Sequence, residues 1–230
     1  MYLVIDTETT NSQIVDDKLD LSNSLVYDLG YAIVDDKGQV YLTRSFVIAD
    51  IFLDDELMSS AYFKDKIPQY KEDIVNGKRT LVSFYTARKQ FLEDYYNYNC
   101  SIVSAHNSHF DIMALNNTVR YLTKSKYRYF FHYSMFIVDT LKMAKATICK
   151  EKEYIKFCTN NNYLTNHKTP RPKATAEILY RYLTNNTEFI ESHTGLEDVL
   201  IEKEILKICL KMLDTNLFEW YNQGTKDKEV

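Results

Sequence analysis

The sequence predicts an α/β protein with a mixed, five-stranded sheet that is flanked by helices. Three strand-like segments follow one another near the N-terminus, helix-spaced apolar residues then take over, and short apolar runs recur between the later helices. Strands joined by tight turns pair antiparallel, whereas alternating helices and strands indicate a layered fold. The 230 residues, 45% of them hydrophobic, can bury one core of good size, so we expect a single domain at 1–220 and a polar tail at 221–230.

The first three strands are predicted from apolar runs bounded by turn residues. They lie at 2–6 (YLVID), 24–34 (SLVYDLGYAIV) and 39–48 (QVYLTRSFVI). The turn Asp35-Asp36-Lys37-Gly38 joins the last two, which makes an antiparallel meander.

Helices and strands alternate in the rest of the chain. Apolar residues at helical spacing predict helix over most of 53–98, with one interruption near Asn76-Gly77. The further expected elements are a buried strand at 100–107, a helix at 110–122 capped by Asn107 or Ser108, a strand at 130–140, a loop-rich stretch at 159–173, and two helices, the second from about Gly195.

The composition predicts a cytoplasmic protein with no membrane partner. The chain has no apolar run of 18 residues and no signal-like N-terminus. Its four cysteines include no C-x-x-C pair, which favours reduced thiols over a disulfide or zinc framework.

Charge is distributed unevenly along the chain. The net charge is −4, yet residues 120–182 contain 13 Lys/Arg against four acids. The same stretch is rich in tyrosine and phenylalanine, and positive charge with aromatic rings suits the phosphates and bases of a single strand. Solvated helix faces with core-facing tyrosines would explain this composition equally well.

The stretch MYLVIDTETT places two carboxylates at the end of an apolar strand. Side chains at i and i+2 of a strand point to one face, so Asp6 and Glu8 should lie side by side. Two anions this close are tolerated where water surrounds both, or where a hard divalent ion such as Mg²⁺ or Mn²⁺ lies between them.

Two more acids end predicted core elements. Asp111 heads a helical stripe that continues through Leu115 and Val119, and Asp139 ends the strand MFIVDT. The positive N-terminus of a helix is by itself a sufficient reason for an acid at position 111. We expect a supporting role for Asp139 and no direct part in catalysis.

The stretch ESHTGLEDVLIEKEIL adds a histidine and an acid. Thr194 and Glu197 have the spacing of a capping box, which places His193 on a loop and Asp198 in the first helical turn. A rigid carboxylate suits a metal ligand, and a loop histidine suits the deprotonation of water. A capping or surface histidine is the alternative interpretation.

These motifs together resemble the DnaQ-like, or DEDDh, family of 3′-5′ exonucleases, which includes the proofreading subunit of bacterial DNA polymerase III, RNase T and oligoribonuclease. Its motifs are matched, in order, by Asp6-Thr7-Glu8-Thr9-Thr10, by His106-Asn107-Ser108-His109-Phe110-Asp111, and by His193 followed by Asp198. The resemblance covers most of residues 1–215 and implies an RNase H-like fold.

The resemblance implies a site with two divalent ions, Mg²⁺ or Mn²⁺, and a histidine base. Asp6, Glu8, Asp111 and Asp198 would hold the ions, with Asp6 as the bridging ligand, and His193 would accept the proton of the attacking water. Such a site would remove nucleoside 5′-monophosphates from the 3′ end of a single-stranded nucleic acid, with DNA favoured over RNA.

Substrate contacts are predicted around this centre. Expected substrate-binding residues are Thr7, Thr9, His106 and Asn107 at the terminal nucleotide, and Arg171 and Lys173 along the strand. The sequence departs from the family at Asn11, where many members have glycine, and in the longer segment 145–173.

Three other functions stay open from the sequence: an RNase H-like endonuclease, a non-catalytic nucleic-acid-binding module, and a phosphodiesterase for small substrates. The endonuclease has no reason to carry the His193 and Asp198 pair, and a non-catalytic module should have lost a ligand. Family members act as homodimers or within a replication complex, so the resemblance leaves the partner open as well.

Overall fold

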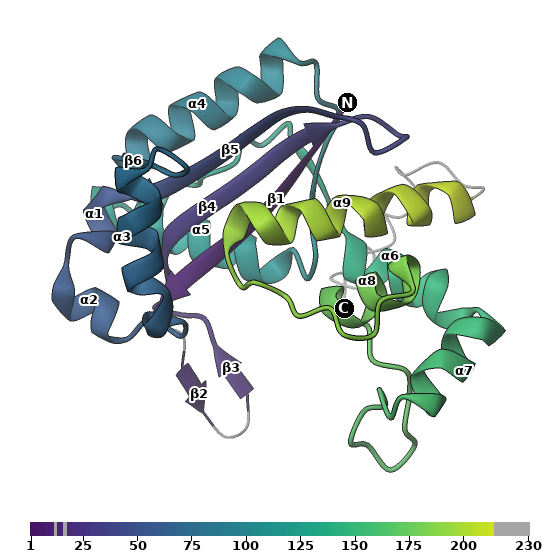
Figure 1. Cartoon of the computed structure of the whole chain (residues 1–230). Coiled ribbons are helices and arrows are strands. Elements are labelled where there is room, and N and C mark those ends of the chain that lie inside the picture. Colours follow the sequence, from purple (N-terminus) through teal and green to yellow (C-terminus); the bar gives the residue numbers. More distant parts are fainter. Residues whose placement is uncertain (12, 16–17, 214–230) are drawn as a thin grey trace.

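The computed structural model describes residues 1–11, 13–15 and 18–213. The predicted tail at 221–230 and the end of the predicted domain lie outside these residues. At the centre is a mixed sheet of six strands in the order β6-β5-β4-β1-β7-β8 (Figure 1).

The sheet confirms the predicted meander followed by parallel strands. β1 (Tyr2–Thr10), β4 (Leu25–Val34) and β5 (Val40–Ile48) pair antiparallel, while β7 (Ile102–Ala105) and β8 (Phe136–Asp139) continue parallel to β1. This arrangement is the RNase H-like α/β fold that was expected.

The expectation of five strands is wrong, because β6 (Thr80–Val82) adds a sixth strand, parallel to β5, at the edge of the sheet. Three residues are too few to show an alternating pattern, so only its pairing with β5 reveals it. A separate two-stranded hairpin, β2 (Gln13–Val15) and β3 (Lys18–Asp20), follows β1.

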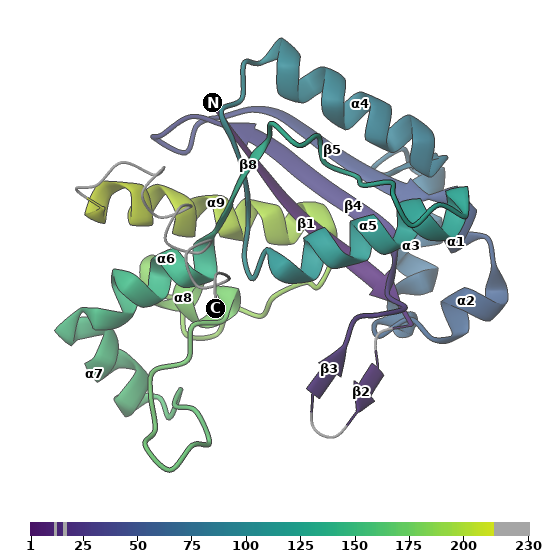
Figure 2. The ribbon, with the colours of Figure 1, turned by 180° about the vertical axis from the view of Figure 1, so that it is seen from behind.

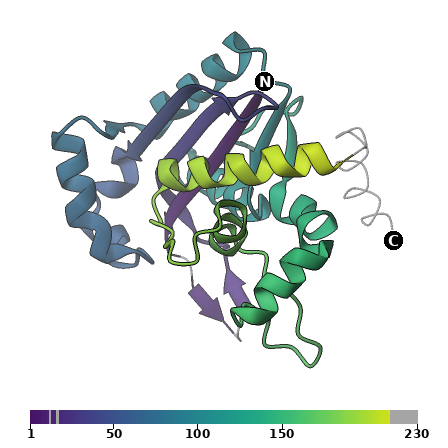
Figure 3. The same cartoon turned by 45° about the vertical axis from the view of Figure 1, so that its right-hand side comes forward.

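Helices cover both faces of the sheet. Figures 1 and 2 show α9 on one face, and α4 and α5 on the other. The helices that pack into the core of the α5 face are α1 (Ala49–Phe52), α2 (Asp55–Ser59), α3 (Ile67–Val75), α4 (Phe84–Asn97) and α5 (His109–Thr123). Those of the α9 face are α6 (Thr140–Ala146), α7 (Lys152–Asn160), α8 (Ala176–Thr184) and α9 (Gly195–Met212), and Figure 3 shows α9 crossing the strands.

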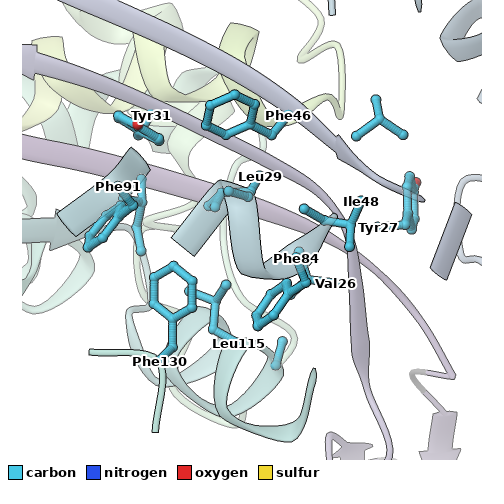
Figure 4. Close-up of a cluster of buried hydrophobic side chains, with 14 of the residues drawn as sticks. Val26, Tyr27, Leu29, Tyr31, Phe46, Ile48, Phe84, Phe91, Leu115 and Phe130 are labelled. Atoms are coloured by element: carbon cyan, nitrogen blue, oxygen red, sulfur yellow. The ribbon is translucent and has the colours of Figure 1, made fainter. Parts of the chain in front are cut away.

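The core of the α5 face is rich in aromatic rings. Figure 4 shows Phe91 between Tyr31 and Phe130, and its ring centroid lies 5.5 Å from that of Tyr31 and 5.1 Å from that of Phe130. The Tyr31 hydroxyl donates to Asp94 Oδ2 at 2.8 Å, which satisfies its polar end.

Two local expectations are wrong, and one segment without a prediction forms helices. The strand predicted at 130–140 is shorter, since β8 begins at Phe136 and Phe130 packs into the core before it. The segment after β8, for which the sequence predicts no element, forms α6 and α7, and α6 begins where Asp139 accepts the backbone N–H groups of Leu141 and Lys142. Neither residue predicted to cap α5 does so: Ser108 makes no side-chain cap bond, and Asn107, with a φ of 67°, donates its backbone N–H to Asp139.

In the part of the chain that the structure describes, none of the helices has both the length and the hydropathy that crossing a membrane requires.

Candidate active site

β1 directs two carboxylates toward α9. Val4 packs in the core of the α9 face, whereas Leu3 and Ile5 pack in the core of the α5 face. Asp6 and Glu8 follow Val4 at every second position of the strand, so their side chains lie on the same face of the sheet as that of Val4 and point toward α9. There Asp198, in the first turn of α9, joins them, and single oxygens of the three carboxylates all lie within 4.8 Å of one another.

Two glycines allow α9 to approach the strands so closely. Gly30 of β4 is paired with Asp6, and a Cβ added to Gly30 would lie 2.2 Å from the carbonyl carbon of Gly195. A Cβ on Gly195 would in turn lie 2.8 Å from the backbone nitrogen of Gly30. The first turn of α9 therefore rests on strand backbone, and this contact places Asp198 above Asp6.

We expect Gly30→Ala to displace the first turn of α9 and to separate Asp198 from Asp6. Overpacking costs about 1–3 kcal/mol in a well-packed core, and backbone cannot move aside as a flexible side chain can. The variant should melt earlier, and it should lose the stabilisation by Mn²⁺ that we expect for the wild-type protein. Thermal melts with and without Mn²⁺ test this, with Thr43→Ala, at an exposed position of β5, as the control. Unchanged stabilisation by Mn²⁺ in Gly30→Ala would contradict this role of the contact.

Asp111 reaches the same cluster from the other face of the sheet. β7 ends at Ala105, so the second half of β1 extends past its neighbour and leaves room for the first turn of α5. Thr7 Oγ1 donates to Asp111 Oδ1 at 2.9 Å and fixes the carboxylate. Burial raises the pKa of Asp111 to about 7, against the lowering effect of the Thr7 hydrogen bond.

Glu202 is a fifth acid of the cluster, and it is not among the site residues that the motifs predict. It is buried one turn after Asp198 on α9, and its Oε2 accepts the backbone N–H of His106 at 3.2 Å. After burial, Glu202 is the largest cause that raises the pKa of Asp6. The helical spacing of four residues from Asp198 is the signal that could have identified it.

The cluster has the electrostatics of a cation site. Burial and neighbouring carboxylates raise the pKa values of Asp6, Glu8 and Glu202 well above their ordinary range, and that of Asp198 to about 8. Like charges held this close are costly unless protons or a cation neutralise them. A donor set made only of carboxylate oxygens fits Mg²⁺ or Mn²⁺.

His193 lies at the edge of the cluster, on the loop before α9. Its φ is 52°, its ring stacks on Phe63 with centroids 4.4 Å apart, and its Nδ1 lies 4.0 Å from Glu191 Oε2. The Lys66 ammonium donates to the Ser192 carbonyl and ties the same loop to the segment before α3. Burial, and then the charge of Lys66, lower the pKa of His193, which favours the neutral imidazole that a base needs.

A cleft of about 520 Å³ opens over the cluster. Two basic residues of the stretch 120–182, Lys145 and Lys173, line this cleft together with the acids. The lining consists of Asp6, Glu8, His106, Asn107, Leu141, Lys145, Thr165, Pro172, Lys173, Ala174, Thr175, Ala176, Glu191, His193, Asp198 and Glu202.

The predicted substrate-binding residues differ in how they relate to this cleft. Asn107 and Lys173 are exposed and line it. His106 also lines it, but its Nδ1 lies 3.1 Å from Thr140 Oγ1 and its Nε2 lies 2.8 Å from the Ala174 carbonyl oxygen. These contacts join the end of β7 to the loop before α8.

The other three predicted contacts are not part of the cleft lining. Thr7 and Thr9 are buried, as expected for β1 side chains on the opposite face from Asp6 and Glu8. Arg171 is exposed on a loop closed by the bridge between Leu164 and Pro172.

Asn11, at the family's glycine position, adopts a φ of 57°. Asparagine tolerates this left-handed conformation better than most residues do. Its backbone N–H donates to Ser60 Oγ at 3.1 Å, which connects the end of β1 to α2.

The fold and the site define an RNase H-like α/β protein with a buried carboxylate cluster beneath a cleft. Neither a family model nor a curated protein sequence matches the chain. Among solved structures, "Exonuclease X in complex with 5' overhanging duplex DNA" is similar, with a TM-score of 0.43 and 15% sequence identity over 96% of this chain and 98% of that chain. Because both values are this low, the function has to be inferred from the residues of this chain.

Proposed function

We propose that this protein is a metal-dependent exonuclease that hydrolyses phosphodiester bonds from the 3′ end of single-stranded nucleic acid, with DNA favoured over RNA. The observation that carries the proposal is the convergence of Asp6, Glu8 and Asp198 within 4.8 Å at the base of the cleft. The products would be nucleoside 5′-monophosphates, released one at a time.

The carboxylates would hold two divalent ions between them. Asp6 is surrounded by Glu8 of β1, Asp111 of α5 and the acids of α9, so it would be the ligand shared by both ions, and Glu8 and Asp198 would complete the site that activates the attacking water. Asp111 would hold the second ion, and Glu202 adds negative charge to the same site. Ions bound there supply an activated water and charge stabilisation for the leaving 3′ oxygen.

The remaining side chains of the cleft orient the strand and move the proton. His193 accepts the proton of the attacking water, and the neighbouring Glu191 carboxylate stabilises the imidazolium that results. Lys145 and Lys173 face the cleft and bind phosphates of the substrate. Asn107, at the start of α5, contacts the terminal nucleotide.

We expect His193→Ala to slow hydrolysis by about 10²–10⁴-fold, the usual contribution of a positioned proton acceptor. Stabilisation by Mn²⁺ should persist, because the carboxylates that hold the ions are unchanged. The measurement is the single-turnover rate on a 5′-labelled oligonucleotide between pH 6 and 8, with His132→Ala as an exposed-histidine control outside the cleft. A His193→Ala enzyme with a rate near wild type over this pH range would exclude His193 as the base.

The polarity of attack separates the exonuclease from the alternative functions. A linear single-stranded oligonucleotide should be shortened from its 3′ end, while a circular strand of the same sequence should stay intact. Cleavage of the circle would establish an endonuclease instead. Binding without cleavage would indicate a non-catalytic module, and turnover confined to small phosphodiesters would indicate the third alternative.

A further inference from the structure

A second basic surface lies outside the cleft, at the C-terminal end of α5. It consists of Arg120, Tyr121, Lys124, Lys126, Tyr127, Arg128, Tyr129 and Tyr133, together with Arg88 of α4, and is called the α5 surface below. The sequence contains no acid from position 120 to position 138. Within the described residues, none of these five cations forms an ion pair with a carboxylate.

Arg88 and Arg128 are close enough for their charges to repel, and neither forms an ion pair with a carboxylate of the described residues. Arg88 Nε donates to the Phe130 carbonyl oxygen at 2.7 Å, which brings α4 to the segment that follows α5. Burial, and after it the charge of Arg128, lower the pKa of Arg88. Positive charges concentrated in this way attract an anionic partner.

The tyrosines of this surface face solvent. Tyr121 is 41% exposed, Tyr127 78%, Tyr129 56% and Tyr133 94%. Core packing, the alternative interpretation of the sequence, is therefore wrong for these four residues. The cations lie against the rings: Lys124 Nζ is 4.3 Å from the ring centroid of Tyr121, Lys126 Nζ is 5.2 Å from that of Tyr127, and Arg120 Cζ is 5.0 Å from that of Tyr129.

The α5 surface is separate from the candidate active site. None of its residues lines the cleft. Asp111 is in the first turn of α5 and Lys124 follows its last residue, so the rise of the helix puts about 20 Å between them. Figure 2 shows the segment between α5 and β8 crossing the face of the molecule opposite α9.

We propose that the α5 surface is a second binding site for single-stranded nucleic acid, with phosphates on the lysines and arginines and bases stacked on the exposed tyrosines. The inference rests on the proposed function, since the 3′ end of the same strand would occupy the cleft. At the stacked spacing of about 3.4 Å per nucleotide, 20 Å corresponds to about six nucleotides, and an extended single strand needs fewer. A dinucleotide cannot reach both places, whereas a 20-mer can.

The test compares binding and hydrolysis in full-length variants. Lys124→Gln/Lys126→Gln/Arg128→Gln removes three charges from the surface, and Lys37→Gln/Lys71→Gln/Lys211→Gln removes three exposed charges elsewhere. Binding of a labelled 20-mer is measured in Ca²⁺ buffer over a range of salt. The surface variant should flatten the slope of log affinity against log salt by about 2, since each phosphate contact on a single strand contributes about 0.7.

Tyr127→Ala tests stacking by itself and should weaken 20-mer binding by about 5-fold to 150-fold. For both sets of variants the KM for a 20-mer should rise, while kcat/KM for a dinucleotide stays at the wild-type value. Circular dichroism and melting curves verify that each variant is folded.

A surface variant that binds the 20-mer with the salt slope of the control triple variant would overturn the proposal. The same unchanged slope is expected if the α5 surface binds an acidic protein segment and not a nucleic acid, and it would overturn the proposal in that case too. Equal loss of dinucleotide and 20-mer turnover would likewise contradict a separate site. Failure of the wild-type protein to hydrolyse any strand, with intact binding at the α5 surface, would instead remove the exonuclease and leave the binding site standing.

Discussion

Asp6→Asn is expected to abolish hydrolysis and leave the protein folded. Asp6 lies where the acids of β1, α5 and α9 meet, and its pKa is raised, after burial, by Glu202, Asp111 and Glu8. A metal-bound transition state is stabilised by several kcal/mol of charge interaction, and a loss of about 4 kcal/mol slows turnover by about 10³-fold. The amide keeps the size of the side chain, so packing against α9 is preserved.

Thermal melts distinguish lost chemistry from lost structure in this variant. Without metal, Asp6→Asn should melt at or above the temperature of the wild type, because one acid has left a crowded cluster. With Mn²⁺ the wild type should gain stability and the variant should gain little. Asp36→Asn, at an exposed turn, should behave as wild type in both assays. More than a tenth of wild-type activity in Asp6→Asn would contradict its role as shared ligand.

Arg79→Met is expected to cause the largest loss of stability. The Arg79 side chain is 2% exposed and contacts three acids, with Asp28 and Asp73 at 3.2 Å and Glu197 at 2.8 Å. Asp28 of β4 is fully buried beneath the first turn of α9, so removal of the cation leaves an uncompensated charge in the interior. Breaking a buried pair in this way costs about 3–5 kcal/mol.

Urea unfolding measures this effect. Lys78→Met is the matched control, since Lys78 pairs with the same Asp73 at 3.3 Å but is 70% exposed, and a surface pair contributes about 0–1 kcal/mol. Arg79→Met should also weaken metal binding, because Glu197 precedes Asp198 and Asp28 accepts the backbone N–H of Gly195. A free energy of unfolding within about 1 kcal/mol of wild type would show that the interior tolerates Asp28 without this partner.

The elements that the sequence predicts correctly are those whose own side chains carry the pattern. The meander of β1, β4 and β5 follows from apolar runs and one turn, and the shared face of Asp6 and Glu8 follows from the pleat. The start of α9 follows from Thr194, although its hydroxyl donates to Glu197 and its backbone N–H goes to Asp198. Spacing thus locates the helix start, but packing decides which atoms form the cap.

The features that escape sequence analysis depend on contacts between distant segments. Thr80–Val82 becomes a strand only beside β5, and Gly30 is required only because Gly195 lies against it. Nothing in the sequence distinguishes Arg79 from a charged surface residue, and its contacts with three carboxylates are seen only in the structure. Glu202 has a local signal, its helical spacing from Asp198, yet only the structure shows that this acid belongs to the cluster around Asp6.

The proposed metal-dependent exonuclease activity is tested most directly by a time course on a 5′-labelled single-stranded DNA, with excess chelator and then with added Mg²⁺. Five acids directed into one site predict no cleavage in chelator and, after Mg²⁺ is added, a ladder that shortens by one nucleotide at a time from the 3′ end. When the experiment is repeated with Asp6→Asn in place of the wild type, no ladder should form at any concentration of added Mg²⁺. Hydrolysis that continues unchanged in chelator would contradict the metal dependence, and a labelled mononucleotide as the first product would contradict attack from the 3′ end.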